Sequence, residues 1–133
     1  MMKVFIDTSA FYALACESDQ FHSQAKAILE KLLQEEYALV TSNYILIETC
    51  NLILYRLGVS ALRTFLEVST KAIFLQWISQ QIHEKGIGKW LGVGKKDLSL
   101  VDCTSFLVMK LEGIKEVFAF DSDFEKEGFR IVR

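Results

Sequence analysis

The chain has 133 residues, of which 51% are hydrophobic, so it has the size of one domain with one core. Its 15 Lys and Arg residues against 17 Asp and Glu residues give a net charge of -2. This balance excludes a general electrostatic attraction to nucleic acid or to an anionic membrane, so any polyanion must meet a local patch. No apolar run is long enough to span a membrane, and Asp7 interrupts the run that would otherwise resemble a secretory signal. We expect a single domain over residues 1–133, soluble and cytoplasmic, with no membrane association.

The three cysteines, Cys16, Cys50 and Cys103, are far apart and contain no Cys-x-x-Cys pair. An odd number at this spacing is typical of reduced thiols and not of a disulfide framework or a zinc site. We expect them to act as small core residues.

Short apolar runs alternate with helical patterns along the chain. The sequence predicts strands at residues 4–6, 37–41, 72–77, 117–120 and 129–132. Helical patterns follow residue 7 and begin again near residues 21, 43, 60, 79 and 99, with one further turn at 124–127. This alternation predicts a three-layer α/β/α sandwich with a mainly parallel central sheet.

Two of the predicted strands deliver a carboxylate at their carboxyl ends. Asp7 follows the first strand, and Asp121 and Asp123 follow the fourth. Ligands of open α/β sheets bind outside this edge of the sheet. The alternative is that Asp7 only caps the next helix, since Asp accepts hydrogen bonds from the free N–H groups of a first turn.

The predicted helix over residues 43–57 has Glu48 and Arg56 as its only charged residues and is apolar on nearly all sides. Such a helix is expected to be largely buried. No Lys or Arg lies within one turn of Glu48, so its carboxylate would need a remote Arg, a proton or a cation. The alternative is a Glu on a narrow exposed strip.

The predicted strand at 72–77 shows little alternation, which predicts that it is not half exposed. After it, four glycines between residues 86 and 94 predict a loosened, flexible segment. The same segment carries Lys85, Lys89, Trp90, Lys95 and Lys96, which are suited to a nucleic-acid backbone and a base. A solvated loop whose Trp packs on the core explains the pattern equally well.

Ser99 and Asp102 have the spacing of a capping box at the start of the predicted helix near residue 99. A carboxylate in a first turn is also held ionised by the helix dipole, which suits a metal ligand. With Asp7, Glu48 and Asp121, Asp102 completes an oxygen-only set without His or Cys, which favours Mg²⁺ or Mn²⁺ over zinc.

These residues resemble the PIN domains, and especially the toxin ribonucleases of VapC type, over nearly the whole chain. The resemblance rests on Val4-Phe5-Ile6-Asp7-Thr8-Ser9-Ala10, Glu48, Leu98-Ser99-Leu100-Val101-Asp102-Cys103 and Phe118-Ala119-Phe120-Asp121-Ser122-Asp123-Phe124. It implies that Asp7, Glu48, Asp102 and Asp121 are the catalytic, metal-binding acids, with Asp123 ancillary and Thr8 or Ser9 in support. One departure is Ala119, where such proteins often carry Ser or Thr.

The resemblance implies a divalent-metal-dependent endoribonuclease that hydrolyses RNA phosphodiesters, with water as nucleophile, and a small antitoxin that restrains it. We expect apolar residues beside the cleft to receive that partner or to form a homodimer, and the alternative is that they are ordinary core residues. We expect a set of polar and basic residues to bind RNA. The apolar residues are Phe11, Tyr12, Leu54 and Tyr55, and the RNA-binding candidates are Thr8, Ser9, Arg56, Lys89, Lys95 and Lys96.

Other functions meet specific obstacles. The Asp121-Ser122-Asp123 motif lies too late in the chain, and is followed by the wrong residue, for a haloacid-dehalogenase-like phosphatase. An EF-hand needs Gly at Lys126 and Glu at Val132. A receiver-like phosphoacceptor domain would need a late active-site Lys, for which the chain has no clear candidate. A non-catalytic module that binds RNA or a partner protein is a further alternative, and the net negative charge disfavours its RNA-binding form.

Overall fold

The computed structural model describes all residues, 1–133, and contains one sheet of five strands, all parallel. The strands lie in the order β3-β2-β1-β4-β5. They are β1 (Lys3–Ile6), β2 (Ala38–Ser42), β3 (Phe74–Gln76), β4 (Glu116–Phe118) and β5 (Arg130–Ile131). The predicted α/β class and parallel sheet are confirmed.

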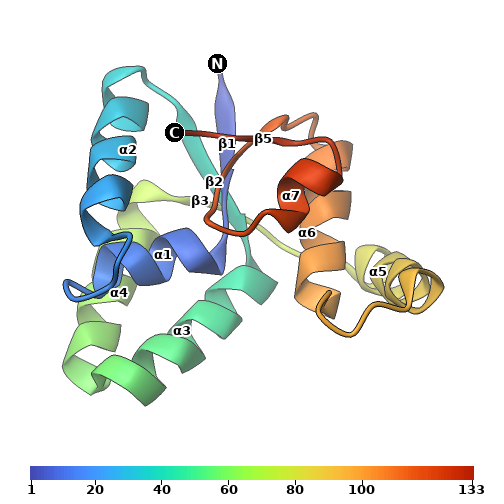
Figure 1. Ribbon diagram of the computed structural model, residues 1–133, viewed down its shortest axis with the longest axis horizontal. Helices are drawn as coiled ribbons and strands as arrows, with labels where there is room; N and C mark the ends of the chain where they lie inside the picture. The colour runs from blue at the N-terminus through green and yellow to red at the C-terminus, as the bar shows by residue number, and fades with distance from the viewer.

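Seven helices connect and cover the strands. They are α1 (Thr8–Ala15), α2 (His22–Gln34), α3 (Asn43–Leu57), α4 (Val59–Ala72), α5 (Gln80–Val93), α6 (Leu100–Leu111) and α7 (Asp123–Lys126). In Figure 1, α1, α2 and α4 lie on one side of the sheet and α5, α6 and α7 on the other, while α3 runs below it. The layers are therefore α/β/α, and none of the helices combines the length and apolarity that crossing a bilayer requires.

The central strand β1 pairs with β2 on one side and β4 on the other, with Phe5 opposite Val40 and Val117. From β1 the chain adds strands outward in one direction through β2 and β3, and later in the other direction through β4 and β5. The point where the order reverses lies between β1 and β4. In open parallel sheets this switch point opens a crevice at the carboxyl ends of the strands.

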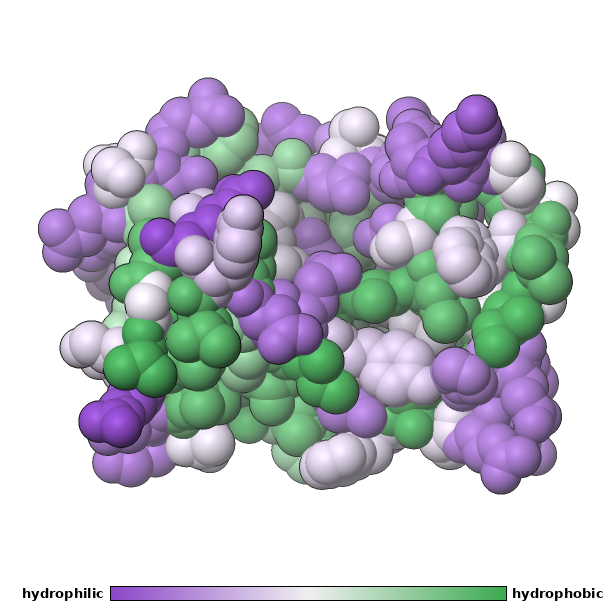
Figure 2. Space-filling view, turned by 90° about the horizontal axis from the view of Figure 1, so that it is seen from below, coloured by the Kyte–Doolittle hydropathy of each residue, from purple (hydrophilic) through white to green (hydrophobic).

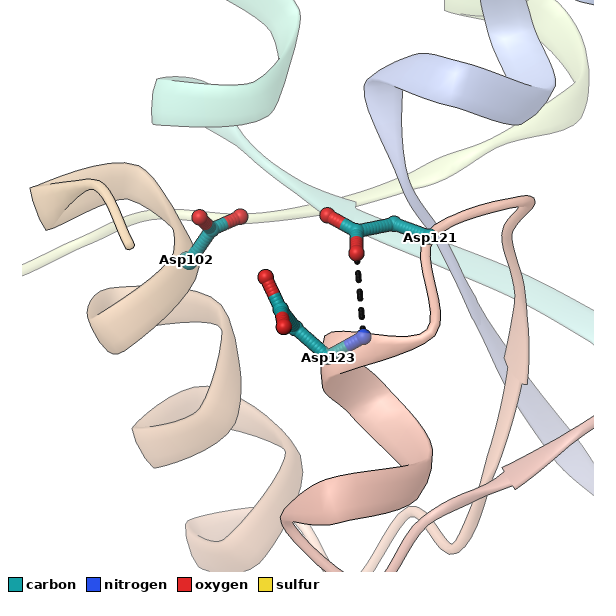
Figure 3. Close-up of side chains that lie close together, drawn as sticks. All are labelled: Asp102, Asp121 and Asp123. Carbon is teal, nitrogen blue, oxygen red and sulfur yellow. Dashed lines mark hydrogen bonds between the residues drawn. The ribbon is translucent and has the colours of Figure 1, made fainter. Parts of the chain in front are cut away.

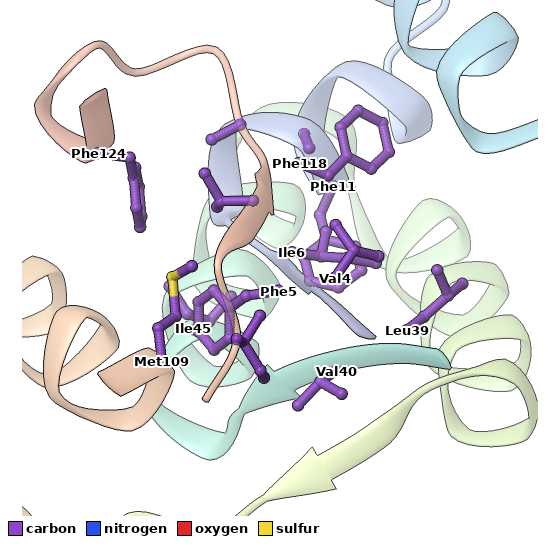
Figure 4. Packing of buried hydrophobic residues seen from close by; sticks show 14 of the residues in the cluster. Val4, Phe5, Ile6, Phe11, Leu39, Val40, Ile45, Met109, Phe118 and Phe124 are labelled. Atoms are coloured by element: carbon purple, nitrogen blue, oxygen red, sulfur yellow. The ribbon is translucent and has the colours of Figure 1, made fainter. Parts of the chain in front are cut away.

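The core lies between the sheet and both helical layers. Val4, Phe5 and Ile6 of β1 are at most 1% exposed. Figure 4 shows them between residues of β2, β4 and the helices, among them Leu39, Val40, Phe118, Phe11, Ile45, Met109 and Phe124. A strand buried on both faces fixes the position of the residue that follows it, because its register cannot slip without exposing apolar side chains.

Two expectations about burial are wrong. Strand β3 is an edge strand whose Phe74 is 66% exposed, because no further strand pairs with it. On α3, only Ile45, Thr49 and Ile53 are buried. The other apolar side chains of α3 do not all find a covering element, and Ile47, Leu54 and Tyr55 are exposed.

The expected loosening at residues 86–94 is also wrong, because α5 continues through three of the four glycines to Val93. Gly86 is buried, and a Cβ placed there would lie 2.7 Å from the Thr104 side chain of α6. Its absent side chain lets α5 and α6 approach closely. Only Gly94 ends the helix, in the left-handed conformation with φ of 65°.

Candidate metal centre

Asp7 directly follows β1 and caps α1, so the capping role that the sequence offered is confirmed, while its role as a metal ligand stays a prediction. One carboxylate oxygen accepts hydrogen bonds from the Ser9 hydroxyl at 2.7 Å and the Ser9 N–H at 3.3 Å. The same hydroxyl accepts from the N–H of Phe120, two residues after β4, at 3.0 Å. Ser9 therefore connects the two strands that border the switch point.

Asp102, Asp121 and Asp123 come together at the same edge, each offering one oxygen, with these oxygens all within 4.8 Å of one another. Figure 3 shows Asp102 on α6 facing the other two, which lie on the segment that enters α7. Asp123 therefore lies with the other acids, closer to the centre of the site than an ancillary role implies. Its carboxylate also pairs with Lys126 at 3.3 Å.

The capping box at α6 is present, as the sequence predicts. The Ser99 hydroxyl accepts from the Asp102 N–H, and one oxygen of Asp102 accepts from the Ser99 N–H, both at 3.0 Å. The other oxygen of Asp102 makes no hydrogen bond. Capping and metal binding are thus compatible, because they use different oxygens of one carboxylate.

Asp7, Asp102 and Asp121 share this arrangement. One oxygen of each accepts a backbone N–H, which for Asp121 is that of Asp123 at 2.9 Å, and the second oxygen is free. Anchoring one oxygen fixes the direction of the other, as the outer hydrogen bonds of metal ligands do. None of the three carboxylates forms an ion pair with Lys or Arg.

The raised pKa values of two of the acids also favour a cation at this site. Burial raises the pKa of Asp7 to about 7, against the opposing hydrogen bonds from Ser9, and the nearby charges of Asp102 and Glu48 add to the rise. Burial also raises the pKa of Asp102, with a further contribution from Asp121 and Asp123. Gathered carboxylates stay ionised together only beside a cation, and free carboxylate oxygens suit Mg²⁺ or Mn²⁺.

Glu48 lies on α3, half-buried, near enough to Asp7 to influence its pKa but outside the group formed by Asp102, Asp121 and Asp123. It pairs with no Lys or Arg. The neighbouring Thr49, fully buried, donates a hydrogen bond to the Thr8 hydroxyl at 3.2 Å and so joins α3 to the start of α1. Sequence reasoning missed Thr49. A Thr next to Glu48 in an otherwise apolar helix was the available signal.

A second contact missed from the sequence joins α3 to α5. The Tyr44 hydroxyl and Nδ1 of His83 are 2.5 Å apart, and both side chains are half-buried. Tyr44 lies one turn before Glu48. No sequence pattern relates residues that are 39 positions apart, so only the packing of the two helices reveals the pair.

The predicted RNA-binding residues lie in different surroundings. Lys89 is paired with Glu127 at 3.1 Å and its side chain is only 24% exposed, whereas Lys95 and Lys96 are exposed. Arg56 lies 5.3 Å from the Tyr12 ring, in the last turn of α3. The Trp90 indole N–H donates to the Leu98 carbonyl at 2.7 Å, but Trp90 is 38% exposed and lies on a helix, so the alternative of a solvated loop whose Trp packs on the core is wrong. Their role in RNA binding stays a prediction.

Comparisons with known proteins show the family of this chain. A family model for the PIN domain matches residues 4–129. The chain is 35% identical over 136 aligned residues to the 23S rRNA-specific endonuclease VapC20 of Mycobacterium tuberculosis, with 98% of each protein covered.

Solved structures share the fold. The crystal structure of Mycobacterium tuberculosis VapC20, a sarcin-ricin loop cleaving toxin, matches with a TM-score of 0.84 and 30% identity, covering 95% of both chains. VapBC2 from Rickettsia felis, bound to a DNA fragment from their promoter, matches with a TM-score of 0.73 and 10% identity, covering 98% of this chain and 97% of that one. At that identity the second match shows the fold alone. Matched along nearly its whole length by model, sequence and structure, the chain belongs to the PIN domain family.

Proposed function

We propose that this protein is a divalent-metal-dependent endoribonuclease, the toxin of a toxin-antitoxin pair, and that it acts in the cytoplasm on ribosomal RNA. The observation that carries the proposal is the geometry of Asp7, Asp102 and Asp121. Each holds one oxygen on a backbone N–H and leaves the other free at the switch point of the sheet. The 35% identical relative is a 23S rRNA-specific endonuclease, which makes 23S rRNA the first substrate to test.

The chain supplies positioning and charge for phosphodiester hydrolysis. Asp102, Asp121 and Asp123 would hold Mg²⁺ or Mn²⁺ from one side, and Asp7 and Glu48 would complete the acidic set from β1 and α3. When bound, the cation supplies Lewis acidity toward the phosphodiester and eases deprotonation of the attacking water. Ser9 keeps the Asp7 carboxylate in place, and no residue is required as a covalent nucleophile.

The test is cleavage of purified 23S rRNA with Mg²⁺ or Mn²⁺ against a chelator, using wild type, Asp7→Asn and Asp102→Asn. We expect cleavage only with metal, and a loss of at least about a hundred-fold in each variant, since even outer-shell changes cost ten- to a hundred-fold. The matched control is Asp97→Asn, which changes an exposed aspartate just before α6. Cleavage that survives the chelator and both substitutions would contradict the metal mechanism.

Apolar surface supports the antitoxin part of the proposal. A groove of about 450 Å³ lies between α1, α2 and α4, lined by Phe11, Leu14, Leu29, Phe65 and Ile73 among others. Leu33 and Val68, which also line it, are more than half exposed. Of the apolar residues expected from the sequence, Phe11 lines this groove but is only 3% exposed and belongs to the core, while Leu54 and Tyr55 are exposed on α3. Exposed apolar surface of this kind is typical of a site that receives a partner's helix.

Expression of the chain alone and together with the small open reading frame beside it tests this part. We expect growth arrest when the chain is expressed alone, and relief with co-purification when the neighbour is present. If growth is normal and no partner is recovered, the toxin assignment fails, while a metal-dependent ribonuclease without an antitoxin still agrees with the cleavage assay.

A further inference from the structure

Trp77 is a large aromatic side chain that the fold leaves in solvent at the edge where the acids gather. It directly follows β3 and is 67% exposed. It makes no side-chain hydrogen bond and no ring contact, whereas the other tryptophan, Trp90, donates its indole N–H to Leu98. Leaving an indole in water forfeits the stabilisation that its burial would bring. Single exposed apolar residues are common on protein surfaces, so the weight of Trp77 comes from its position beside the acids and not from its exposure alone.

The backbone beneath Trp77 is fixed on both sides. Before it, Gln76 pairs with Ser42 in the β3–β2 register. After it, the Ile78 N–H donates to the Asn43 side chain at 2.6 Å, and the Ser79 hydroxyl caps α5. The indole is therefore presented from a rigid segment, which lowers the entropic cost of binding through it.

Trp77 lies on the same side of the molecule as the acids. All five strands are parallel, so the carboxyl end of β3 points the same way as those of β1 and β4. Strand β3 is two strands from β1, which corresponds to roughly 10 Å across the sheet. Asn43, which holds the backbone of Ile78, begins the helix that carries Glu48. Figure 2 views this end of the molecule, where apolar and polar side chains are interleaved.

We infer that Trp77 is a stacking platform for a nucleobase of the RNA that the acidic site cleaves, an inference that rests on the proposed function. Unpaired bases of RNA loops stack on aromatic side chains, and every base offers a face for this contact. Stacking needs no positive charge. This matters in a chain of net charge -2, in which Lys89 of α5 is already paired with Glu127.

The experiment compares Trp77→Ala, Trp77→Phe and the matched control Phe74→Ala in cleavage of 23S rRNA. Phe74 is exposed to the same degree, at 66%, but begins β3, so it lies roughly 10 Å from Trp77 and away from the acidic edge. We expect Trp77→Ala to raise KM roughly ten-fold with little change in kcat, as loss of one stacked base predicts. Trp77→Phe should keep most of the affinity, and Phe74→Ala should match wild type.

A binding measurement checks the contact without catalysis. In a Trp90→Phe, Asp121→Asn protein, Trp77 is the only tryptophan, and its fluorescence should be quenched in a saturable manner by a short single-stranded oligouridylate. An unchanged KM in Trp77→Ala, or no quenching, would overturn the inference while metal-dependent cleavage by wild type still stands.

If wild type cleaves no RNA, the proposed function fails, and the quenching experiment alone then decides whether Trp77 binds RNA. Light scattering of wild type and both alanine variants tests a further outcome. If wild type is a dimer, Trp77→Ala and Phe74→Ala are monomers, and KM is unchanged, then the two aromatic residues form a contact between two copies of the chain and the stacking role is wrong.

Discussion

The Ser9 hydroxyl donates to the Asp7 carboxylate at 2.7 Å and accepts from the backbone of Phe120, so one side chain ties the first acid to the strand that precedes Asp121. We expect Ser9→Ala to lower kcat/KM about ten-fold or more, because hydrogen bonds to charged groups are worth about 1.5–3 kcal/mol. The Phe120 N–H would also lose its acceptor. Ser9→Thr keeps a hydroxyl and is the control. Equal activity in all three proteins would show that Asp7 needs no such support.

The pKa of Asp7 predicts how stability depends on pH in metal-free protein. Burial raises this pKa from 3.8 to about 7, so the folded chain binds the proton more tightly than the unfolded chain does. The contribution of Asp7 to the free energy of unfolding is therefore greatest below pH 3.8. It falls as the pH rises to about 7, and it is constant above that pH. In Asp7→Asn this decline should shrink to the part that Asp102 contributes, and unfolding at about pH 8 should cost up to about 4 kcal/mol more than in wild type.

Urea unfolding at a series of pH values, with chelator present, measures this difference. Asp97→Asn, at an exposed position, should follow wild type throughout. Asp7→Asn should at the same time be inactive, since the residue that costs stability is also a proposed ligand. A wild-type protein that gains stability between pH 4 and 7 through this residue would contradict the assignment.

Metal binding should stabilise the fold through Asp121. A ligand that binds only the folded chain raises the midpoint of thermal unfolding. We expect Mn²⁺ or Mg²⁺ to raise this temperature in wild type and to have little effect in Asp121→Asn, because its free oxygen faces Asp102 and Asp123. Glu125→Gln, on the exposed side of α7, should retain the wild-type response. Differential scanning fluorimetry with and without metal makes the comparison.

Lys89 and Lys95 should behave differently when truncated. Lys89 is paired with Glu127, which Lys110 also approaches at 3.5 Å, so Lys89→Ala should lower stability by up to about 1 kcal/mol. Lys95 is exposed, and Lys95→Ala should reduce RNA affinity and the salt dependence of binding. Fluorescence anisotropy at several salt concentrations, paired with thermal unfolding, separates the two effects. A larger loss of RNA affinity in Lys89→Ala than in Lys95→Ala would reverse the assignment.

The glycines of α5 should differ in their response to alanine. A Cβ at Gly86 would lie 2.7 Å from Thr104, and overpacking typically costs about 1–3 kcal/mol, so Gly86→Ala should destabilise the protein. Gly88 has open space around it, and Gly88→Ala should stabilise by up to about 1 kcal/mol through helix propensity. Chemical denaturation of both variants makes the test. A stabilised Gly86→Ala would mean that α6 moves away at little cost.

Local patterns predicted the parallel sheet and the places where Asp7, Asp102 and Asp121 stand. A strand followed by Asp, or a Ser three residues before Asp, is a signal within one short stretch of chain. The same reasoning failed on α3 and α5, because the burial of Leu54 and the close packing at Gly86 depend on which elements lie beside them. Composition shows that a helix is apolar, but it does not show whether another element covers it.

The sequence does not predict the contact between Tyr44 and His83 or the exposure of Trp77 either, and the cause is the same. Each depends on where α5 begins relative to α3, which the hydrogen bond from Ile78 to Asn43 helps to set. The spacing also places Asp123 beside Asp121, but it does not show that Asp102 faces both.

Strand β1 lies against β4, and so the residues that meet at the switch point are separated by more than a hundred positions in the chain. During synthesis the ribosome releases Asp7 and Glu48 long before Asp121 and Asp123, and β1 has no neighbour on that side until β4 emerges. The acidic set therefore cannot assemble on a nascent chain that is still short of its last strands. A nuclease built this way cannot form its acidic set until the segment that carries Asp121 and Asp123 has left the ribosome, so the part of the chain that emerges first holds no complete site.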